Sequence, residues 1–271
     1  QNQAIVKVVA ALIGMIPEGL VLLASVVLAV SVIRLAKHKT LVQELYCIET
    51  LARVDMLCLD KTGTITEGRM ELEDILPIDK NRNREEISEI FGKMTGAMED
   101  HSATFAALRE YFAGKDFSAP WQVRKIVPFS SVKKWSGITF EEKGSFVIGA
   151  AEFIYFNRLK EKSAEDEVLE ATVKKSSDMG RRVLLLAHSR EDFNERELPG
   201  DLQPLALAVL SDVIRPEAYD TLKFFREQGV NIKVISGDNP ETVASVAGTA
   251  GLKDADNYID VSRLTDAQLE E

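Results

Sequence analysis

The stretch from Leu57 to Gly68 reads LCLDKTGTITEG, and it indicates the fold class of the whole chain. An almost continuous apolar run, Val54 to Leu59, leads directly into Asp60. Such a run predicts a strand covered on both faces, as in parallel sheets. Because ligands bind outside the carboxyl ends of strands in open α/β sheets, Asp60 lies where a carboxylate can bind a metal or attack a phosphoryl group. The alternative is an ordinary Asp-Lys turn.

The longer motif, DKTGT followed by TEG, resembles the phosphorylation motif of the P-type ATPases, ion pumps that transfer phosphate from ATP to its Asp. The resemblance implies that Asp60 is the nucleophile and that the backbone carbonyl of Thr62 helps to hold Mg²⁺ beside it. It also implies that Thr64 hydrogen-bonds phosphate oxygens and that Lys61 belongs with these catalytic residues. The implied cofactors are therefore Mg²⁺ and ATP.

The residue at position 62 favours a pump over a phosphatase. Related haloacid-dehalogenase-type phosphatases usually carry a second Asp two residues after the nucleophile, where it acts as a general acid and base. This chain has Thr62 there. The resemblance therefore implies a longer-lived aspartyl-phosphate, which suits a protein that must hold this intermediate while it changes shape.

Length and charge restrict the possible partners. The chain has 271 residues and a formal net charge of −10, which leaves room for one membrane segment and one or two globular units. The acidic balance argues against a nucleic-acid partner, because nucleic-acid binding usually needs a basic face. Cys47 and Cys58 are too few for a disulfide framework, and both are predicted to be buried thiols.

The N-terminal segment is predicted to cross a membrane. From Val8 to Ile33 the only charged residue is Glu18, and a helix of this length spans a bilayer. A buried core helix is the alternative, whereas a signal peptide would be shorter and would have a cleavage signal. Basic residues follow at once, which places the downstream chain in the cytoplasm by the positive-inside tendency. Because the first residue is Gln1, we expect a fragment or a processed chain.

The same apolar run contains Pro17 and Glu18 in the motif PEGL. A proline frees backbone carbonyls one turn earlier, around Ile13, and an ionisable residue at membrane depth predicts a functional site. Oxygen ligands of this kind suit Ca²⁺. PEGL also resembles the fourth membrane helix of Ca²⁺-type and Na⁺/K⁺-type pumps, so Glu18 is the expected ligand of the transported cation. A kinked helix with a protonated Glu is the structural alternative.

The pattern of apolar residues and turns predicts an α/β fold. It is a Rossmann-like, haloacid-dehalogenase-type phosphorylation domain, incomplete here, interrupted by an α+β nucleotide-binding domain and preceded by one transmembrane helix. The expected division is a membrane helix over 1–36, a stalk and the first part of the phosphorylation domain over 37–72, a nucleotide-binding domain over 73–204, and the second part over 205–271. Within the 37–72 segment, residues 40–53 are predicted to be helical.

Periodicity and capping residues predict the individual elements of the remaining chain. The predicted helices are 85–98, 103–112, 164–179 with Ser163 as N-cap, one opening at Pro216, and 241–250. The predicted strands are 123–129, 135–141, 145–148, 182–188, 205–210 and 231–236. The strand at 205–210 is assigned to the Rossmann-like sheet.

Two further motifs follow predicted strands in the last segment. Ser236-Gly237-Asp238-Asn239 matches the TGDN motif of the family, with Ser in place of Thr. Asp212 and Arg215 match the first and last residues of its D-P-P-R pattern, whereas the two prolines are absent. The resemblance implies that Ser236, Gly237, Asp238, Asp212 and Arg215 lie near the nucleotide phosphates. A capped loop and a surface ion pair are the alternatives.

The inserted domain resembles the nucleotide-binding domain of the family at three residues. Phe129 is expected to stack on adenine, and Lys134 and Arg182 are expected to meet phosphates. The alternatives are that Phe129 is a core residue and that Lys134 and Arg182 are simply solvated. The sequence departs from the family at Ile148, where a Lys is common, and at Phe105, where many members have a Glu near the adenine.

These patterns predict an integral membrane protein of a bacterial plasma membrane, with its catalytic part in the cytoplasm. The predicted function is ATP-driven transport of a cation, with Ca²⁺ favoured, through an aspartyl-phosphate; the expected partners are ATP, the cation and the lipid bilayer. A soluble aspartate-nucleophile phosphatase with a cap domain and a membrane-tethered ATP-binding module without turnover are the alternatives. Because the later Mg²⁺-binding motif and the actuator loop of the family are absent from these residues, the fragment alone is expected to be inactive.

Overall fold

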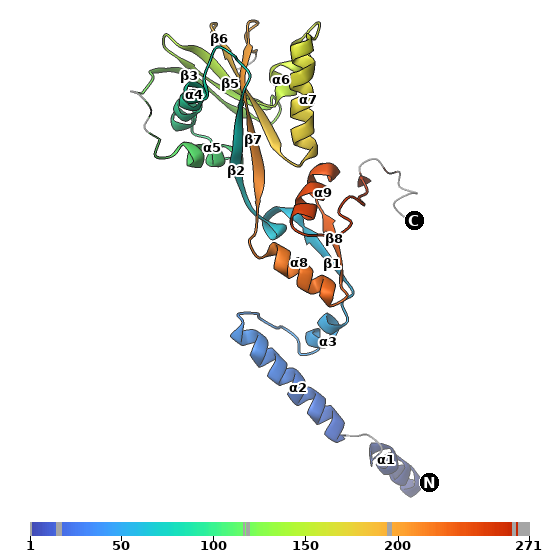
Figure 1. Cartoon of the computed structure of the whole chain (residues 1–271). Coiled ribbons are helices and arrows are strands. Elements are labelled where there is room, and N and C mark those ends of the chain that lie inside the picture. The colour runs from blue at the N-terminus through green and yellow to red at the C-terminus, as the bar shows by residue number, and fades with distance from the viewer. Residues whose placement is uncertain are drawn as a thin grey trace. The chain divides into compact units, whose positions relative to one another are not determined.

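The computed structural model describes residues 2–14, 18–115, 117, 120–193, 197–261 and 264. The chain divides into two compact units, one made of Gln1–Leu57 with Gly229–Asn231 and the other of Cys58–Gln228 with Ile232–Glu271 (Figure 1). Each unit is described by itself below.

The first unit is helical. It contains α1 (Asn2–Gly14), α2 (Glu18–Lys37) and α3 (Cys47–Ala52). Within the described residues one helix segment, Gly19–Lys37, is long and apolar enough to cross a membrane by length and composition, with a mean hydropathy of 2.4. Pro17 and the side chain of Glu18 lie outside the described residues, so the predicted ion site stays a prediction.

The predicted helix over residues 40–53 is wrong for its first half, because only α3 is helical. Lys39 adopts a left-handed backbone conformation, with φ of 61°, and the N–H of Thr40 bonds back to the carbonyl of Leu35 at 3.0 Å, which closes the end of α2. Leu41 and Leu45 are 87% and 46% exposed. Because these two side chains are exposed, they do not provide the packing that usually stabilises a helix more than propensity does.

The second unit is built around a six-stranded sheet with the order β2-β7-β6-β5-β4-β3, in which every neighbouring pair is antiparallel. The strands are β2 (Thr66–Pro77), β3 (Val123–Ser130), β4 (Trp135–Phe140), β5 (Gly144–Gly149), β6 (Arg182–Ser189) and β7 (Gln203–Ile214).

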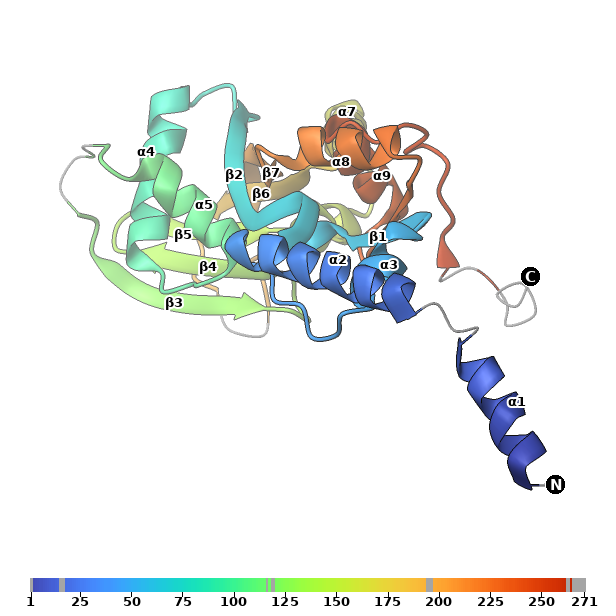
Figure 2. The ribbon, with the colours of Figure 1, turned by 90° about the horizontal axis from the view of Figure 1, so that it is seen from below.

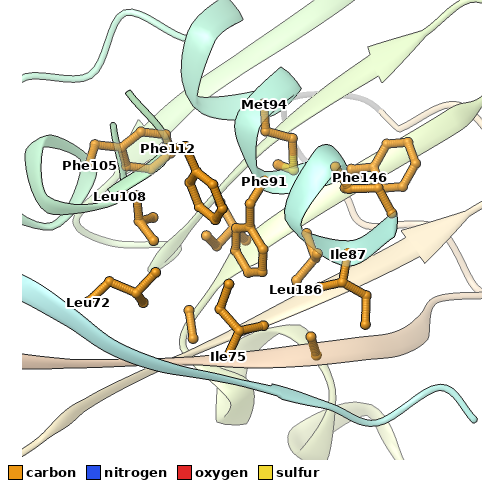
Figure 3. Close-up of a cluster of buried hydrophobic side chains, with 14 of the residues drawn as sticks. Leu72, Ile75, Ile87, Phe91, Met94, Phe105, Leu108, Phe112, Phe146 and Leu186 are labelled. Carbon is orange, nitrogen blue, oxygen red and sulfur yellow. The ribbon is translucent and has the colours of Figure 1, made fainter. Parts of the chain in front are cut away.

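Helices cover both faces of this sheet. α4 (Arg84–Ala97) and α5 (Ala103–Phe112) pack on one face (Figure 2), where Phe91 and Phe112 stack with ring centroids 5.9 Å apart. Figure 3 shows how Phe91, Phe146 and Leu186 meet in this core. α6 (Ala151–Ile154) and α7 (Ala164–Asp178) contribute to a second core on the other face.

Most predicted elements of the inserted region are confirmed because their signals are local. α5 spans Ala103–Phe112 as predicted, and Ser163 caps α7 in a capping box with Asp166. β2, a strand of twelve residues that pairs with β7, was not predicted.

The strand predicted at 205–210 is present in β7 but belongs to a different sheet from the one expected. It pairs with β6 and β2 instead of completing the Rossmann-like sheet. Strand pairing is non-local, so an apolar run predicts a strand without predicting its neighbours. The expected boundary at 72/73 falls inside β2 and the boundary at 204/205 falls inside β7, so neither coincides with the end of an element.

A small two-stranded sheet contains β1 (Met56–Asp60) and β8 (Asn231–Ile235). Helices α8 (Ala218–Glu227) and α9 (Pro240–Thr249) accompany it, and their apolar side chains share a core with Leu59, Ile232 and Val234.

The prediction that β1 is buried on both faces is wrong within the described residues, because exposed and half-buried positions alternate along it. α8 and α9 cover the face that bears Leu59, whereas Cys58 on the other face is exposed. Cys47 is half-buried, so the prediction of two buried thiols is also wrong.

Candidate active site

The DKTGT motif forms a tight turn between β1 and β2. After Asp60 the turn Lys61–Ile65 contains Gly63 with φ of 76°, a conformation that glycine adopts without the steric cost that other residues meet. Ile65 is 2% exposed and anchors the end of the turn in the core shared with α8 and α9. Asp60, Thr62 and Thr64 are exposed, so the turn presents one carboxylate and two hydroxyl groups to a ligand.

Lys61 is the buried charge of the site. Its side chain is 4% exposed and forms ion pairs with Asp212 Oδ2 and, at 2.7 Å, with Asp238 Oδ2. Burial by itself would lower the pKa of Lys61, but the hydrogen bonds and charges of both carboxylates outweigh it, and the pKa is raised above its ordinary value. The ammonium therefore stays charged and joins three segments that are far apart in the sequence.

Arg215, the residue that follows β7, supports the same turn. Its Nη2 donates to the carbonyl oxygen of Gly63 at 2.9 Å, and its backbone N–H donates to the carbonyl of Ile65 at 3.0 Å. The two matching residues of the D-P-P-R pattern, Asp212 and Arg215, thus both hold the nucleophile turn. The structure brings them beside the motif, whereas their contact with a nucleotide stays a prediction.

The loop after β8 is organised by its own side chains. Ser236 Oγ accepts from the N–H of Asp238 at 3.2 Å, and Asn239 Oδ1 accepts from the N–H of Glu241 at 2.9 Å, which caps α9. Gly237 lies exposed between them. The capped loop that was the alternative interpretation is therefore present, and its carboxylate at Asp238 also reaches Lys61.

Phe129 and Lys134 lie on or beside β3. Phe129 is 50% exposed, so it is not a core residue and its ring is available to a ligand. Lys134 is exposed in the turn between β3 and β4, with φ of 60°, and its carbonyl accepts from the N–H of Ala150 at 3.0 Å. Gly149 is required there, because a Cβ would lie 2.3 Å from that carbonyl oxygen. Ile148 is 2% exposed and packs in the core that contains α4 and α5.

Arg182 begins β6, and its Nη1 donates to Thr104 Oγ1 on α5 at 2.7 Å. Thr104 is buried beside Phe105, which is 4% exposed in the same core. Sequence reasoning missed Thr104, since nothing in its spacing connects it to a residue 78 positions later. Among the described residues, no hydrogen bond or ion pair joins Lys134 or Arg182 to the group around Asp60.

Comparisons with known proteins agree with this geometry. The sequence profile of a hydrolase family, described as haloacid dehalogenase-like hydrolase, matches residues 54–267. The chain belongs to the haloacid dehalogenase-like hydrolases.

The relatives of this chain include proteins named as cation-transporting ATPases. The chain is 42% identical over 270 residues to the "Probable cation-transporting ATPase exp7" of Streptococcus pneumoniae serotype 4, covering 99% of this chain and 33% of that protein. It is 39% identical over 252 residues to the "Calcium-transporting ATPase CtpE" of Mycobacterium bovis, covering 93% of this chain and 30% of that protein. The chain therefore spans about a third of the length of these relatives.

A solved structure shows the same fold. A crystal structure of a zinc-transporting PIB-type ATPase in the E2.Pi state matches with a TM-score of 0.62 at 18% identity, over 84% of this chain and 33% of that one. At this identity the match supports the fold alone. Together with the sequence relatives, it confirms the resemblance to P-type ATPases that the motif indicated.

Asp60 and Thr62 are the candidate magnesium ligands of this haloacid dehalogenase-like hydrolase. The carboxylate of Asp60 and the backbone carbonyl of Thr62 are hard oxygen ligands, and Mg²⁺ usually keeps several waters beside one or two carboxylates. In the part of the chain that the structure describes, no group of three or more His, Cys, Asp or Glu side chains could hold a metal ion. The oxygens of Asp60 and Thr62 suit Mg²⁺ by their chemistry, and their binding of the ion stays a prediction.

Proposed function

We propose that the whole protein transports a cation across a membrane with energy from ATP, and that Asp60 carries the phosphoryl group. The observation that supports this most is the exposed carboxylate of Asp60 at the end of β1, beside a buried ammonium that binds two other carboxylates. Because Lys61 pairs with both Asp212 and Asp238, it compensates one of their two negative charges, which lowers the repulsion that an anionic phosphate meets as it approaches.

The proposed reaction transfers the γ-phosphoryl group of ATP to Asp60. An oxygen of the Asp60 carboxylate attacks the γ-phosphorus of ATP, the bond between this phosphorus and the bridging oxygen breaks, and ADP leaves with the electron pair. Thr64 and the Ser236–Gly237 loop are proposed to donate hydrogen bonds to phosphate oxygens. The chemistry that Mg²⁺ supplies when bound at Asp60 and Thr62 is neutralisation of charge on those oxygens.

Thr62 favours a stored intermediate over rapid hydrolysis. A phosphatase of this family needs a group near the nucleophile that takes a proton from the attacking water. A threonine hydroxyl is a poor general base at neutral pH, so the aspartyl-phosphate is expected to persist. The phosphatase alternative therefore lacks its usual proton acceptor at this position.

ATP is proposed to reach Asp60 from the six-stranded sheet. Phe129 offers a half-exposed ring for base stacking, and Lys134 and Arg182 offer cations for the phosphates. Ile148 is buried, so a cation that many family members carry at that position is replaced by a core contact. Affinity for ATP is therefore expected to depend more strongly on Phe129.

The proposed ion is Ca²⁺ and the proposed site of action is a bacterial plasma membrane. Two observations support the ion: the PEGL motif around Glu18 and a relative named as a calcium-transporting ATPase. The apolar Gly19–Lys37 segment supports a membrane location. Its two serine hydroxyls bond to the helix itself, Ser25 to the carbonyl of Val21 and Ser31 to that of Val27, both at 2.9 Å, so neither hydroxyl needs water.

The test is phosphorylation of the full-length protein by ATP labelled in the γ position. We expect an acid-stable, hydroxylamine-labile phosphoenzyme that disappears in Asp60→Asn, while ATP still binds. Asp55→Asn is the matched control, because this exposed Asp lies just before β1 and should leave labelling unchanged. Labelling that persists in Asp60→Asn would refute the nucleophile, and ATP binding without any phosphoenzyme would favour the tethered binding module.

A further inference from the structure

The turn between α7 and β6 contacts α9. Ser245 Oγ on α9 donates to the backbone carbonyl of Met179 at 2.7 Å. Gly180 follows with φ of 78°, and a Cβ built on it would lie 3.1 Å from Ser245 Cβ and 3.2 Å from the carbonyl oxygen of Thr242. A side chain at this position would therefore push the turn away from α9. Figure 1 shows the C-terminal end of α7 beside α9.

The next two residues hold the sheet side of the same turn. Arg181 Nε pairs with Glu73 Oε2 on β2 at 2.6 Å, and Arg182 Nη1 donates to Thr104 Oγ1 on α5 at 2.7 Å. Consecutive residues of one turn thus contact α9, β2 and α5. The position of Arg182 is consequently tied both to its own sheet and to α9.

The other end of α9 reaches the nucleophile turn. α9 begins after Asn239, and the preceding residue, Asp238, binds Lys61 next to Asp60. α9 therefore lies between two contacts, that of Ser245 with Met179 and that of Asp238 with Lys61.

We propose that Ser245 and the Met179–Arg182 turn form a latch that fixes the six-stranded sheet against α9 and so sets the distance between Arg182 and Asp60. This inference rests on the proposed function for its kinetic consequence. Ser245 is a positioning residue: it acts through Met179 and Arg182. The latch governs the rate at which bound ATP is brought to Asp60, whereas ATP affinity depends on the sheet itself.

The first test compares Ser245→Ala with Thr249→Ala in the full-length protein. Thr249 is the matched control, because its hydroxyl lies on the same helix but bonds only within it, to the carbonyl of Ser245 at 2.9 Å. We expect Ser245→Ala to slow phosphoenzyme formation by about three- to tenfold, the effect of one neutral hydrogen bond, with ATP affinity within about twofold of wild type. Ser245→Thr keeps the hydroxyl and should restore most of the rate.

The second test measures hydrogen exchange and does not depend on turnover. Ser245→Ala should increase exchange in peptides covering both 179–189 and 240–250, whereas Thr249→Ala should affect only the second. Faster exchange in both peptides with no phosphoenzyme in any variant would support the latch and refute the proposed function. An increase confined to 240–250, or an unchanged rate of phosphorylation in Ser245→Ala together with labelling in wild type, would overturn the latch.

Discussion

Replacing Lys61 by methionine tests the charge arrangement beside Asp60, because it removes the ammonium and keeps an unbranched side chain of similar length. The side chain of Lys61 is 4% exposed, and those of its partners Asp212 and Asp238 are 19% and 49% exposed. Removing one partner of a buried ion pair costs about 3–5 kcal/mol. Asp238 is half exposed, so solvent screens its interaction with Lys61. We therefore expect Lys61→Met to lower the local free energy of unfolding by about 3 kcal/mol, the low end of this range.

The assay is native-state hydrogen exchange of the amides in residues 56–66 and 231–250, which reports opening around the nucleophile turn. A loss of about 3 kcal/mol corresponds to exchange faster by roughly a hundredfold. Lys233→Met on β8 is the control, because it removes the same charge from an exposed position and should change protection by less than about 0.5 kcal/mol. The double variant Lys61→Met/Asp212→Asn should recover part of the loss, since one uncompensated carboxylate is neutralised.

The pH dependence of this contribution has a definite sign. The pKa of Lys61 is raised above 10.5 in the folded chain, so the folded state holds the proton more tightly than the unfolded state. The stabilisation is fully present below pH 10.5 and is lost as the pH rises through the folded value. Tyr155 titrates in the same range, because burial and a hydrogen bond to Asp166 raise its pKa to about 12, so the series is run in Tyr155→Phe. Less than tenfold loss of protection in Lys61→Met, or no alkaline difference from wild type, would refute the reasoning.

Three other changes have defined outcomes. Gly63→Ala should destabilise the turn by about 1–2 kcal/mol through backbone conformation alone, since nothing lies within 4 Å of the added Cβ. Asn adopts the left-handed conformation more readily than Ala, so a thermal shift of Gly63→Asn equal to that of Gly63→Ala would contradict this. Phe129→Ala should weaken ATP binding by about 1–3 kcal/mol in calorimetric titration and leave stability unchanged, whereas a loss of stability would make the ring structural. Glu18→Gln should shift the Ca²⁺ dependence of phosphorylation to higher concentrations; if every cation response is unaltered, the carboxyl is structural.

The sequence predicted elements whose causes are local and missed contacts that depend on pairing. Ser163 with Asp166 and the extent of α5 follow from neighbouring residues, and both are confirmed. The membership of β7 in the six-stranded sheet depends on β6 and β2, which a local pattern cannot specify. The predicted helix over 40–53 was wrong because helical spacing does not create a surface for Leu41 to cover.

The candidate site was likewise predictable only where its signal is local. The motif located Asp60, but the partners of Lys61 are 151 and 177 residues away in sequence, and no spacing rule connects them. The contacts of Arg182 with Thr104 and of Ser245 with Met179 were likewise invisible, since each forms only when separate elements pack.

The pairing of β2 with β7 includes a residue of the candidate active site. Asp212, which binds Lys61, also lies in the ladder opposite Met70, and the register of β2 shifts between Thr66 and Met70. The register shifts again between Leu72 and Asp74, and such irregularities bend a strand locally and increase its twist. A displacement of Asp212 would therefore act on the β2–β7 ladder and on Lys61 together, because this one residue belongs to both contacts.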